Sequence, residues 1–303
     1  MSIKAEPAVA SPPAASTPGT GTYASQLIAA WRVISRNRLA LLGGFVILVG
    51  VFTAIFAPLL ATHDPYEIDI VNRLRGPGPG HWLGTDVLGR DTFSRLVYGA
   101  RTAFQVAIGA VALGAIAGIP LGAIAGFYGR RVDAIVMRFM DSVLAFPGQL
   151  LAIALVAALG GGLISLYIAI GVSSIPQYAR IVRGVVLSQK EREYVEAARM
   201  VGESNLRVLF GEILPNCVAP IIVTLSFDFA HAILIESSLS FLGLGFPPPT
   251  ASWGLMLKEI SPFLELQPLS ALFPGLTIAI MILGFNLFGD GLRDLFDPRH
   301  YEI

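Results

Sequence analysis

Long apolar segments with few or no charges alternate with short polar ones along the chain. The apolar segments cover residues 39–61, 102–129, 142–179, 218–245 and 269–289. About 20 apolar residues in a helix cross the ~30 Å apolar core of a bilayer. Residues 142–179 are too many for one span and are interrupted by three consecutive glycines, so they count as two. The pattern predicts an all-α, polytopic membrane protein with six transmembrane helices.

Small residues distinguish the second predicted span from the others. Gly109, Gly114, Gly118, Gly122 and Gly126 recur there at near-multiples of the helical repeat. Small side chains at such positions let two helices approach closely. The second span is therefore predicted to be an interior helix. In the third span, the proline at position 147 is expected to produce a kink.

The polar segments divide the chain into three parts. Residues 1–30 are rich in Ala, Pro, Ser, Thr and Gly and are predicted to form a disordered tail. Residues 31–101 hold an interfacial helix, the first span and an external loop. Residues 102–303 form the core, with five spans and a polar loop at 188–217.

Two details of the external segments follow from residue spacing. Asp86 with Arg90, and Asp91 with Arg95, stand four residues apart and are expected to pair on a short helix. Trp253 follows three prolines and is expected at the membrane interface, where tryptophan is enriched.

Composition agrees with a membrane protein and excludes several other classes. Hydrophobic residues make up 54% of the 303 residues, charged residues 14%, and the mean hydropathy is +0.68. An ordinary soluble domain does not have these values. The 21 basic and 21 acidic residues cancel, so no overall positive charge attracts nucleic acid.

The polar loop at 188–217 carries a predicted helical hairpin. Gly202 allows a sharp turn, and Ser204 is a good N-cap for a second helix. On that helix Leu206, Leu209 and Phe210 are expected to form one apolar edge, with Arg207 facing away. An exposed apolar edge indicates a partner.

Three ionisable residues interrupt the fifth span. Asp228, His231 and Glu236 fall within an arc of about 140° on a helix, so they are predicted to share an interior face. Ionisable groups at this depth face protein or water. They either line a translocation path or form an interhelical hydrogen-bond network that fixes packing.

Catalytic motifs are not found in this sequence. It has no G-x-x-x-x-G-K-[ST] phosphate loop, and no nucleophile–base motif such as G-x-S-x-G. The His, Cys, Asp and Glu residues have no metal-ligand spacing, so no metal site is predicted. We expect a transport protein, not an enzyme, driven by a partner's ATP or by an ion gradient.

Several motifs resemble those of ABC importer permeases. Within 188–217 the residues that match the EAA loop are Glu196, Ala197, Ala198, Gly202, Leu214 and Pro215. Glu212 differs from the motif, because the family prefers an aliphatic residue at that position. The strings at 84–101, 141–147, 236–254 and 286–298 resemble the C-type permeases of dipeptide, oligopeptide and nickel importers. The resemblance covers most of residues 39–298.

The resemblance implies a type I ABC importer permease-like fold without catalytic residues. The 188–217 loop would dock on an ATPase subunit through Glu196, Ala197, Ala198, Gly202, Leu206, Arg207, Leu209, Phe210, Leu214 and Pro215. Implied partners are a paralogous second permease, two ABC ATPase subunits that bind ATP and Mg, an extracytoplasmic solute-binding protein and membrane lipid. The expected substrate is a dipeptide or oligopeptide; alternatives are nickel, glutathione, or ion-coupled secondary transport through Asp228, His231 and Glu236.

The distribution of basic residues predicts the orientation. With six spans, 15 of the 21 Lys and Arg lie on the side of both termini and of the 188–217 loop. The remaining 6 lie on the other side. Cytoplasmic segments carry the excess of positive charge. Both termini and the loop are therefore expected in the cytoplasm, in the plasma (inner) membrane of a prokaryote.

Overall fold

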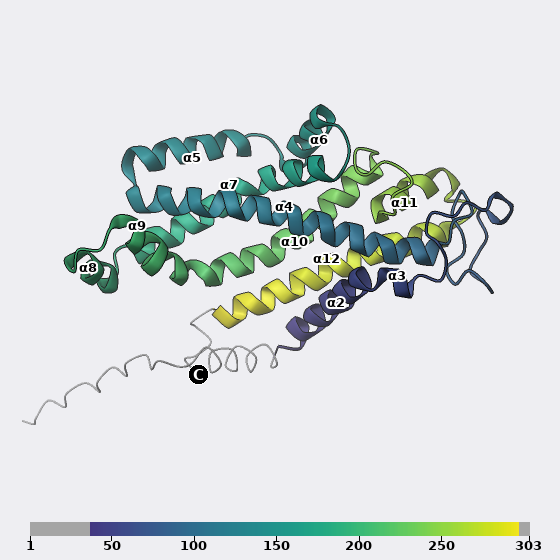
Figure 1. Cartoon of the computed structure of the whole chain (residues 1–303), viewed down its shortest axis with the longest axis horizontal. Helices are drawn as coiled ribbons and strands as arrows, with labels where there is room; N and C mark the ends of the chain where they lie inside the picture. Colours follow the sequence, from purple (N-terminus) through teal and green to yellow (C-terminus); the bar gives the residue numbers. More distant parts are fainter. Residues whose placement is uncertain (1–36, 297–303) are drawn as a thin grey trace, which may run out of the picture.

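The protein is an elongated helical bundle (Figure 1). The computed structural model describes residues 37–296, and each regular element in that range is a helix. The main helices are α2 (Arg38–Ile55), α3 (Ala57–Leu60), α4 (Thr92–Tyr128), α5 (Arg130–Leu144), α6 (Gly148–Leu159), α7 (Leu163–Gln189), α8 (Glu193–Met200), α9 (Asn205–Arg207), α10 (Val218–Phe241), α11 (Trp253–Ile260) and α12 (Pro268–Phe296). Three short 3-10 helices are η1 (Ile70–Asn72), η3 (Leu214–Cys217) and η4 (Ser261–Phe263), and η2 (Val208–Ile213) is a π-helix. The predicted tail at 1–30 and the start of the interfacial helix lie outside the described residues.

The helices agree with the predicted six spans approximately. Four stretches are long and apolar enough to cross a bilayer: Arg38–Ile55, Thr92–Tyr128, Asn205–Phe241 and Pro268–Phe296. The pair α5 and α6 is a fifth candidate, although it is bent by 83°. With 27 residues α7 has sufficient length. However, Gln177, Arg180 and Arg183 make α7 more polar than the other spans.

The bend between α5 and α6 lies where the sequence predicted a kink. Pro147 is the N-cap of α6, and its ring prevents an uninterrupted helix. Ion pairs then tie α5 to α7: Arg180 Nη2 lies 2.6 Å from Asp141 Oδ1, and Arg183 Nη2 donates to Asp133 Oδ2 at 2.6 Å. The bent pair is therefore fastened to the bundle along α7.

Helices α4 and α7 are in backbone contact, which confirms α4 as an interior helix. A Cβ atom at Gly118 would lie 2.6 Å from the Ile175 carbonyl oxygen, and one at Gly122 would lie 2.3 Å from the Ala179 carbonyl oxygen. Real Cβ atoms do not approach other atoms this closely. Glycine is thus required for the observed separation of the two helices.

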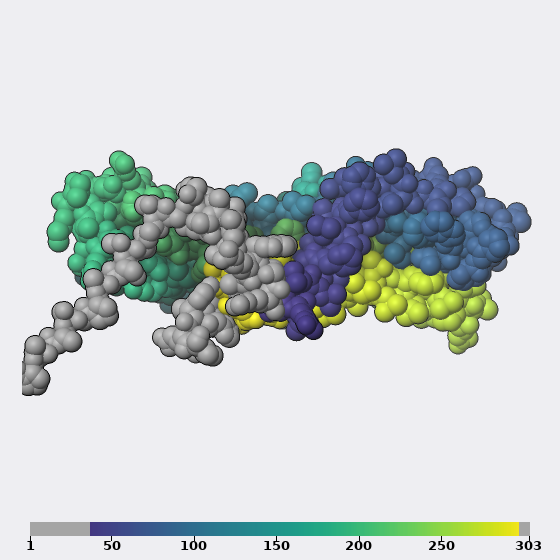
Figure 2. Space-filling model, turned by 90° about the horizontal axis from the view of Figure 1, so that it is seen from below, coloured from purple at the N-terminus to yellow at the C-terminus, as the bar shows by residue number. Residues whose placement is uncertain are grey.

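A second close contact joins the first and last spans. Figure 2 shows α2 lying diagonally across one face of the molecule, next to α12. A Cβ atom at Gly43 would lie 2.5 Å from the Gly284 carbonyl oxygen. Many apolar side chains of α2 remain exposed, among them Leu39, Phe45 and Leu48. This face suits contact with lipid tails or another membrane helix.

The start of α4 differs from the prediction. The helix begins at Thr92, within the predicted external loop, because the Asp91 side chain caps it by accepting from the Ser94 backbone N–H at 2.8 Å. Asp91 therefore does not pair with Arg95. The Asp86–Arg90 pair does form, at 2.6 Å, but in a turn and not on a helix.

Two buried arginines hold the 61–91 loop against α11. Arg90 Nη2 lies 2.6 Å from Glu259 Oε2, and Arg95 lies 3.3 Å from both Asp86 Oδ2 and Glu259 Oε2. Both arginine side chains are almost completely buried. Since one missing partner would leave an uncompensated buried charge, these four residues act as a unit.

Trp253 is buried inside the protein and is not exposed to lipid headgroups. It is buried at the start of α11 and donates from Nε1 to the Leu96 carbonyl oxygen at 2.9 Å. Its ring fills the space above Gly99, where a Cβ would meet it at 2.4 Å. The indole N–H finds its partner inside the protein, which removes the reason for an interfacial position.

The α4–α7 contact predicts that Gly122→Leu destabilises the fold. Overpacking a closely packed site costs about 1–3 kcal/mol, so the midpoint of thermal unfolding of the detergent-purified chain should fall. Gly184→Leu is the matched control, because a Cβ at Gly184 on α7 meets nothing within 4 Å. Equal midpoints for the two variants would contradict the assigned role of the close contact.

Candidate functional site

The predicted hairpin at 188–217 forms one end of the molecule. Helices α8 and α9 lie at that end in Figure 1, opposite the 61–91 loop. We call residues 188–217 the arm. The backbone of Gly202 has φ +86°, a conformation that side-chain-bearing residues rarely adopt. The predicted turn at Gly202 is therefore confirmed.

The second half of the arm begins as the sequence predicted. After the glycine turn, Ser204 caps α9 by accepting from the Arg207 backbone N–H at 3.4 Å. From Asn205 the chain then continues through η2 and η3 into α10 without leaving helical geometry, as far as Phe241. The second half of the arm is thus continuous with a transmembrane helix.

A small apolar core anchors the arm to the ends of α4 and α7. It consists of Ala123, Phe127, Val182, Val186, Val195, Val208, Leu209, Ile213 and Cys217. Leu209 is completely buried, so it is not part of an exposed edge as predicted. The reason is η2, a π-helical segment: its wider turn breaks the i, i+3 relation on which the prediction was based.

Polar contacts reinforce this anchor. The Tyr194 hydroxyl donates to Gln189 Oε1 at 3.0 Å, and the guanidinium of Arg199 lies 5.6 Å from the centre of the Phe127 ring. Burial raises the pKa of the Tyr194 hydroxyl, so the group remains a neutral donor. Lys190 Nζ donates to the Gly126 carbonyl oxygen at 3.3 Å. The arm is therefore attached at its base to both helices of the glycine contact.

Four apolar side chains project from the tip of the arm. Met200 and Val201 are 84% and 85% exposed, and Leu206 and Phe210 are 60% and 44% exposed. We call these four residues the arm patch. The exposure of Met200 and Val201 was not predicted, although their position next to the Gly202 turn indicates it.

The remaining residues of the motif surround the patch. Glu196, Ala197, Arg207 and Pro215 are exposed, whereas Ala198 and Leu214 are half-buried. Arg207 Nε lies 3.5 Å from Glu203 Oε1, an exposed ion pair that contributes little to stability. An exposed apolar cluster with charged neighbours is typical of a protein-binding surface.

The ionisable residues of α10 differ in burial. Asp228 and Glu236 are buried, but the side chain of His231 is 48% exposed and its Nδ1 lies 3.8 Å from Asp228 Oδ1. The predicted interior arc is therefore wrong for His231. Asp228 and His231 are three residues apart and therefore neighbours on the helix surface. Asp228 is buried, whereas His231 is half exposed at the margin of the packed side.

Each buried carboxyl group joins α10 to a neighbouring element. Asp228 accepts from Ser174 Oγ at 2.8 Å and from the Tyr178 hydroxyl at 2.9 Å, both on α7. Glu236 Oε1 accepts from Ser240 at 2.8 Å and from Ser252, just before α11, at 2.9 Å. Such bonds match the packing-network interpretation of Asp228 and Glu236.

Comparison with known proteins identifies two matching family models. The family described as "Binding-protein-dependent transport system inner membrane component" matches residues 118–300. The family described as "N-terminal TM domain of oligopeptide transport permease C" matches residues 25–77. The first match covers more than half of the chain and includes the arm and α10.

Curated relatives align over nearly the whole chain. A dipeptide transport system permease protein, DppC, of Alkalihalophilus pseudofirmus is 45% identical over 89% of both chains. A di/tripeptide transport system permease protein of Pseudomonas aeruginosa is 43% identical over 91% of this chain and 93% of the relative. A glutathione transport system permease protein, GsiD, of Pectobacterium atrosepticum is 42% identical over 89% of this chain and 90% of the relative.

The α10 network predicts different outcomes for two neighbouring substitutions. Asp228→Ala removes the acceptor of two buried hydroxyl groups and should lower stability by about 1–3 kcal/mol. His231→Ala alters an exposed side chain and should change stability by less than about 0.5 kcal/mol. Thermal unfolding of the purified chain in detergent measures both. A larger loss for His231→Ala would contradict the assignment of Asp228 to the packing network.

Proposed function

The chain belongs to the binding-protein-dependent transport permeases, the inner-membrane components of ABC importers, and from this we propose that it carries dipeptides or oligopeptides into the cytoplasm. It is a multi-pass membrane protein that works with an ATPase. The observation that carries the peptide proposal is 45% identity to a dipeptide permease over 89% of both chains. Glutathione is a second candidate substrate, because a glutathione permease is 42% identical. Nickel transport remains a prediction.

The proposed assembly contains this permease and four other subunits. A paralogous second permease would complete the pathway, two ATPase subunits would bind and hydrolyse ATP with Mg, and an extracytoplasmic protein would deliver the solute. The exposed apolar face of α2 supports a partner or lipid on that side. The chain itself is proposed to bind no ATP and to catalyse no reaction.

We propose that the arm patch docks on an ATPase subunit. Met200, Val201, Leu206 and Phe210 supply exposed apolar area at the tip of a segment anchored by its own core. The helical path from Asn205 to Phe241 would transmit a displacement of the docked tip into α10. Nucleotide-driven closure of the ATPases would then alternate the bundle between inward and outward openings.

We propose a cytoplasmic location for the arm and both termini. The excess of basic residues on that side supports it. The arginines on the opposite side weaken this bias only slightly, because Arg90 and Arg95 are buried in ion pairs with Asp86 and Glu259. Paired charges within a folded loop are a weak signal for orientation.

Ion-coupled transport is the less supported alternative. Asp228 and Glu236 each accept hydrogen bonds from neighbouring hydroxyl groups. His231 is half exposed, with its Nδ1 3.8 Å from Asp228 Oδ1. Reconstitution of the complex in vesicles, with labelled dipeptide offered together with the binding protein, distinguishes the two mechanisms. Uptake should require ATP on the side of the membrane that corresponds to the cytoplasm. Uptake by the chain alone, driven by an ion gradient, would contradict the proposal.

Negative charge in the arm patch should disrupt docking of the ATPase subunit. We expect the double variant Leu206→Glu/Phe210→Glu to reduce dipeptide uptake by about tenfold or more, because buried charges at the centre of an interface cost over 1.4 kcal/mol. Stimulation of ATP hydrolysis by the loaded binding protein should fall in parallel. Val71→Glu is the control, since Val71 is 93% exposed at the opposite end. Normal uptake and normal stimulation in the double variant would rule out docking through this patch.

The Gly202 turn allows a backbone test of the same proposal. Gly202→Val forces a β-branched residue into a left-handed conformation, which costs about 1–2 kcal/mol, and should reduce coupled uptake by distorting the arm. Gly202→Asn should retain most uptake, because asparagine tolerates this conformation. A Cβ at position 202 meets nothing within 4 Å, so side-chain clash does not contribute. Equal uptake by both variants would show that the turn's geometry is unimportant for coupling.

A further inference from the structure

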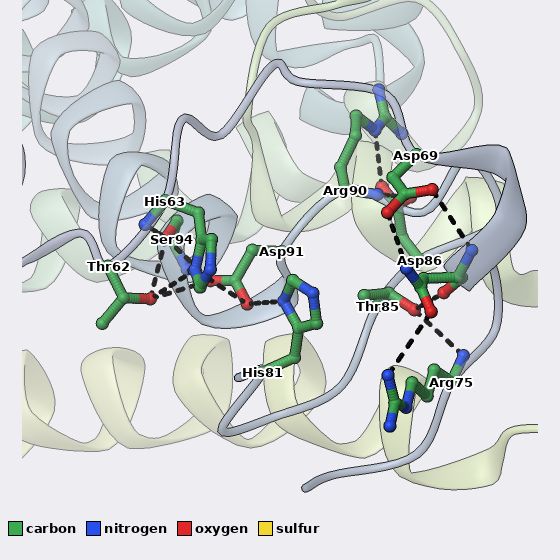
Figure 3. Close-up of polar contacts among 11 residues, drawn as sticks. Thr62, His63, Asp69, Arg75, His81, Thr85, Asp86, Arg90, Asp91 and Ser94 are labelled. Atoms are coloured by element: carbon green, nitrogen blue, oxygen red, sulfur yellow. Dashed lines mark hydrogen bonds and ion pairs between the residues drawn. The ribbon is translucent and has the colours of Figure 1, made fainter. Parts of the chain in front are cut away.

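Three potential metal ligands meet at the end of the molecule opposite the arm. Figure 3 shows the side chains of His63 and His81 beside that of Asp91. His63 follows α3, His81 lies in the 61–91 loop, and Asp91 caps α4. One ligand atom from each residue lies within 4.8 Å of the other two. Residues from three separate segments thus converge on one point.

The Asp91 carboxylate uses its two oxygens differently. Oδ2 accepts from the Ser94 backbone N–H at 2.8 Å, from Ser94 Oγ at 2.7 Å and from Thr62 Oγ1 at 3.3 Å. Oδ1 faces the imidazoles: it accepts a hydrogen bond from His81 Nδ1 at 2.8 Å and lies 3.8 Å from His63 Nδ1. Oδ2 is therefore held by hydrogen bonds from Ser94 and Thr62, while Oδ1 points toward the two imidazoles. Hydrogen bonds that orient a ligand in this way are found around metal sites.

Local contacts also hold the two histidines in place. The backbone N–H of His63 donates to Ser94 Oγ at 3.0 Å, so the hydroxyl that supports Asp91 also positions His63. The imidazole rings of His63 and His81 lie 4.7 Å apart, centre to centre. The ligand set is thus assembled on the capped first turn of α4.

The cluster is partly open to solvent. The side chain of Asp91 is 1% exposed, that of His81 19% and that of His63 38%. A cavity of about 490 Å³, lined by Thr62, His63 and Tyr98 among others, opens beside it. An ion can enter there, and a water molecule can complete its coordination.

We propose that His63, His81 and Asp91 bind a divalent transition-metal cation of the Zn²⁺ type. Zn²⁺ binds imidazole nitrogen and carboxylate oxygen at about 2.0–2.2 Å, so its tetrahedral ligand atoms lie roughly 3.4 Å from one another. His81 Nδ1 and Asp91 Oδ1 would separate slightly from 2.8 Å, and His63 Nδ1 would approach from 3.8 Å. Small side-chain rotations are sufficient. Two imidazoles disfavour Mg²⁺ and Ca²⁺, which prefer oxygen ligands.

The bound cation would cross-link the 61–91 loop to α4. It would join the end of α3, the middle of the loop and the first turn of α4, far from the arm (Figure 1). The sequence predicted no metal site because the three residues have no local ligand spacing, and only the fold brings them together. The proposal does not depend on which solute the protein carries.

The test measures Zn²⁺ bound to the purified full-length chain, without an affinity tag, by calorimetric titration and by metal analysis after dialysis. We expect one Zn²⁺ per chain and a rise in the midpoint of thermal unfolding when Zn²⁺ is added. His63→Ala should weaken Zn²⁺ binding by about tenfold or more. Asp91→Asn should do the same while keeping the helix cap, because asparagine caps as well as aspartate.

His231→Ala is the matched control, because it removes a similarly exposed imidazole outside the cluster. It should leave both the stoichiometry and the affinity unchanged. Co²⁺ in place of Zn²⁺ should give a visible absorption band in the wild-type chain and in His231→Ala, but not in His63→Ala. The proposal is overturned if the wild-type chain binds no Zn²⁺, if binding survives His63→Ala and Asp91→Asn, or if all three variants weaken it equally.

Discussion

The backbone contact between α4 and α7 is the constraint on which the rest of the structure depends. Two helices can approach this closely only where glycine replaces a side chain, as at Gly118 and Gly122. The pair then presents one end to each functional region. Phe127 and Val186 help to form the core that anchors the arm, while Asp91 at the other end organises the 61–91 loop. A single packed pair thereby fixes the positions of both ends relative to each other.

Buried polar groups determine how the other helices join this pair. In a low-dielectric environment an unpartnered carboxylate or guanidinium is costly, so each is placed against a partner from another element. Asp228 binds hydroxyl groups of α7, and Glu236 binds Ser252 next to α11. Arg90 and Arg95 share Glu259 of α11. These contacts specify the arrangement of helices whose apolar surfaces alone would allow several.

The arm combines a fixed base with an exposed tip. Its base is buried against α4 and α7, and its second half continues into α10. The π-helical segment turns Leu209 inward but leaves Leu206 and Phe210 outward, because in a wider turn residues three apart point in more different directions than residues four apart. The same local irregularity therefore secures the arm and presents the surface proposed to contact the ATPase.

The sequence by itself determined the class of protein, the approximate spans, the interior position of α4, the Gly202 turn and the Ser204 cap. Each follows from local composition or spacing, because a bilayer requires long apolar helices and a turn requires particular residues. Only the tertiary structure decided the inward direction of Leu209, the outward direction of His231 and the burial of Trp253. It also decided the meeting of His63, His81 and Asp91. These features depend on which distant segments pack together, and helical periodicity carries no information about contacts between segments far apart in the chain.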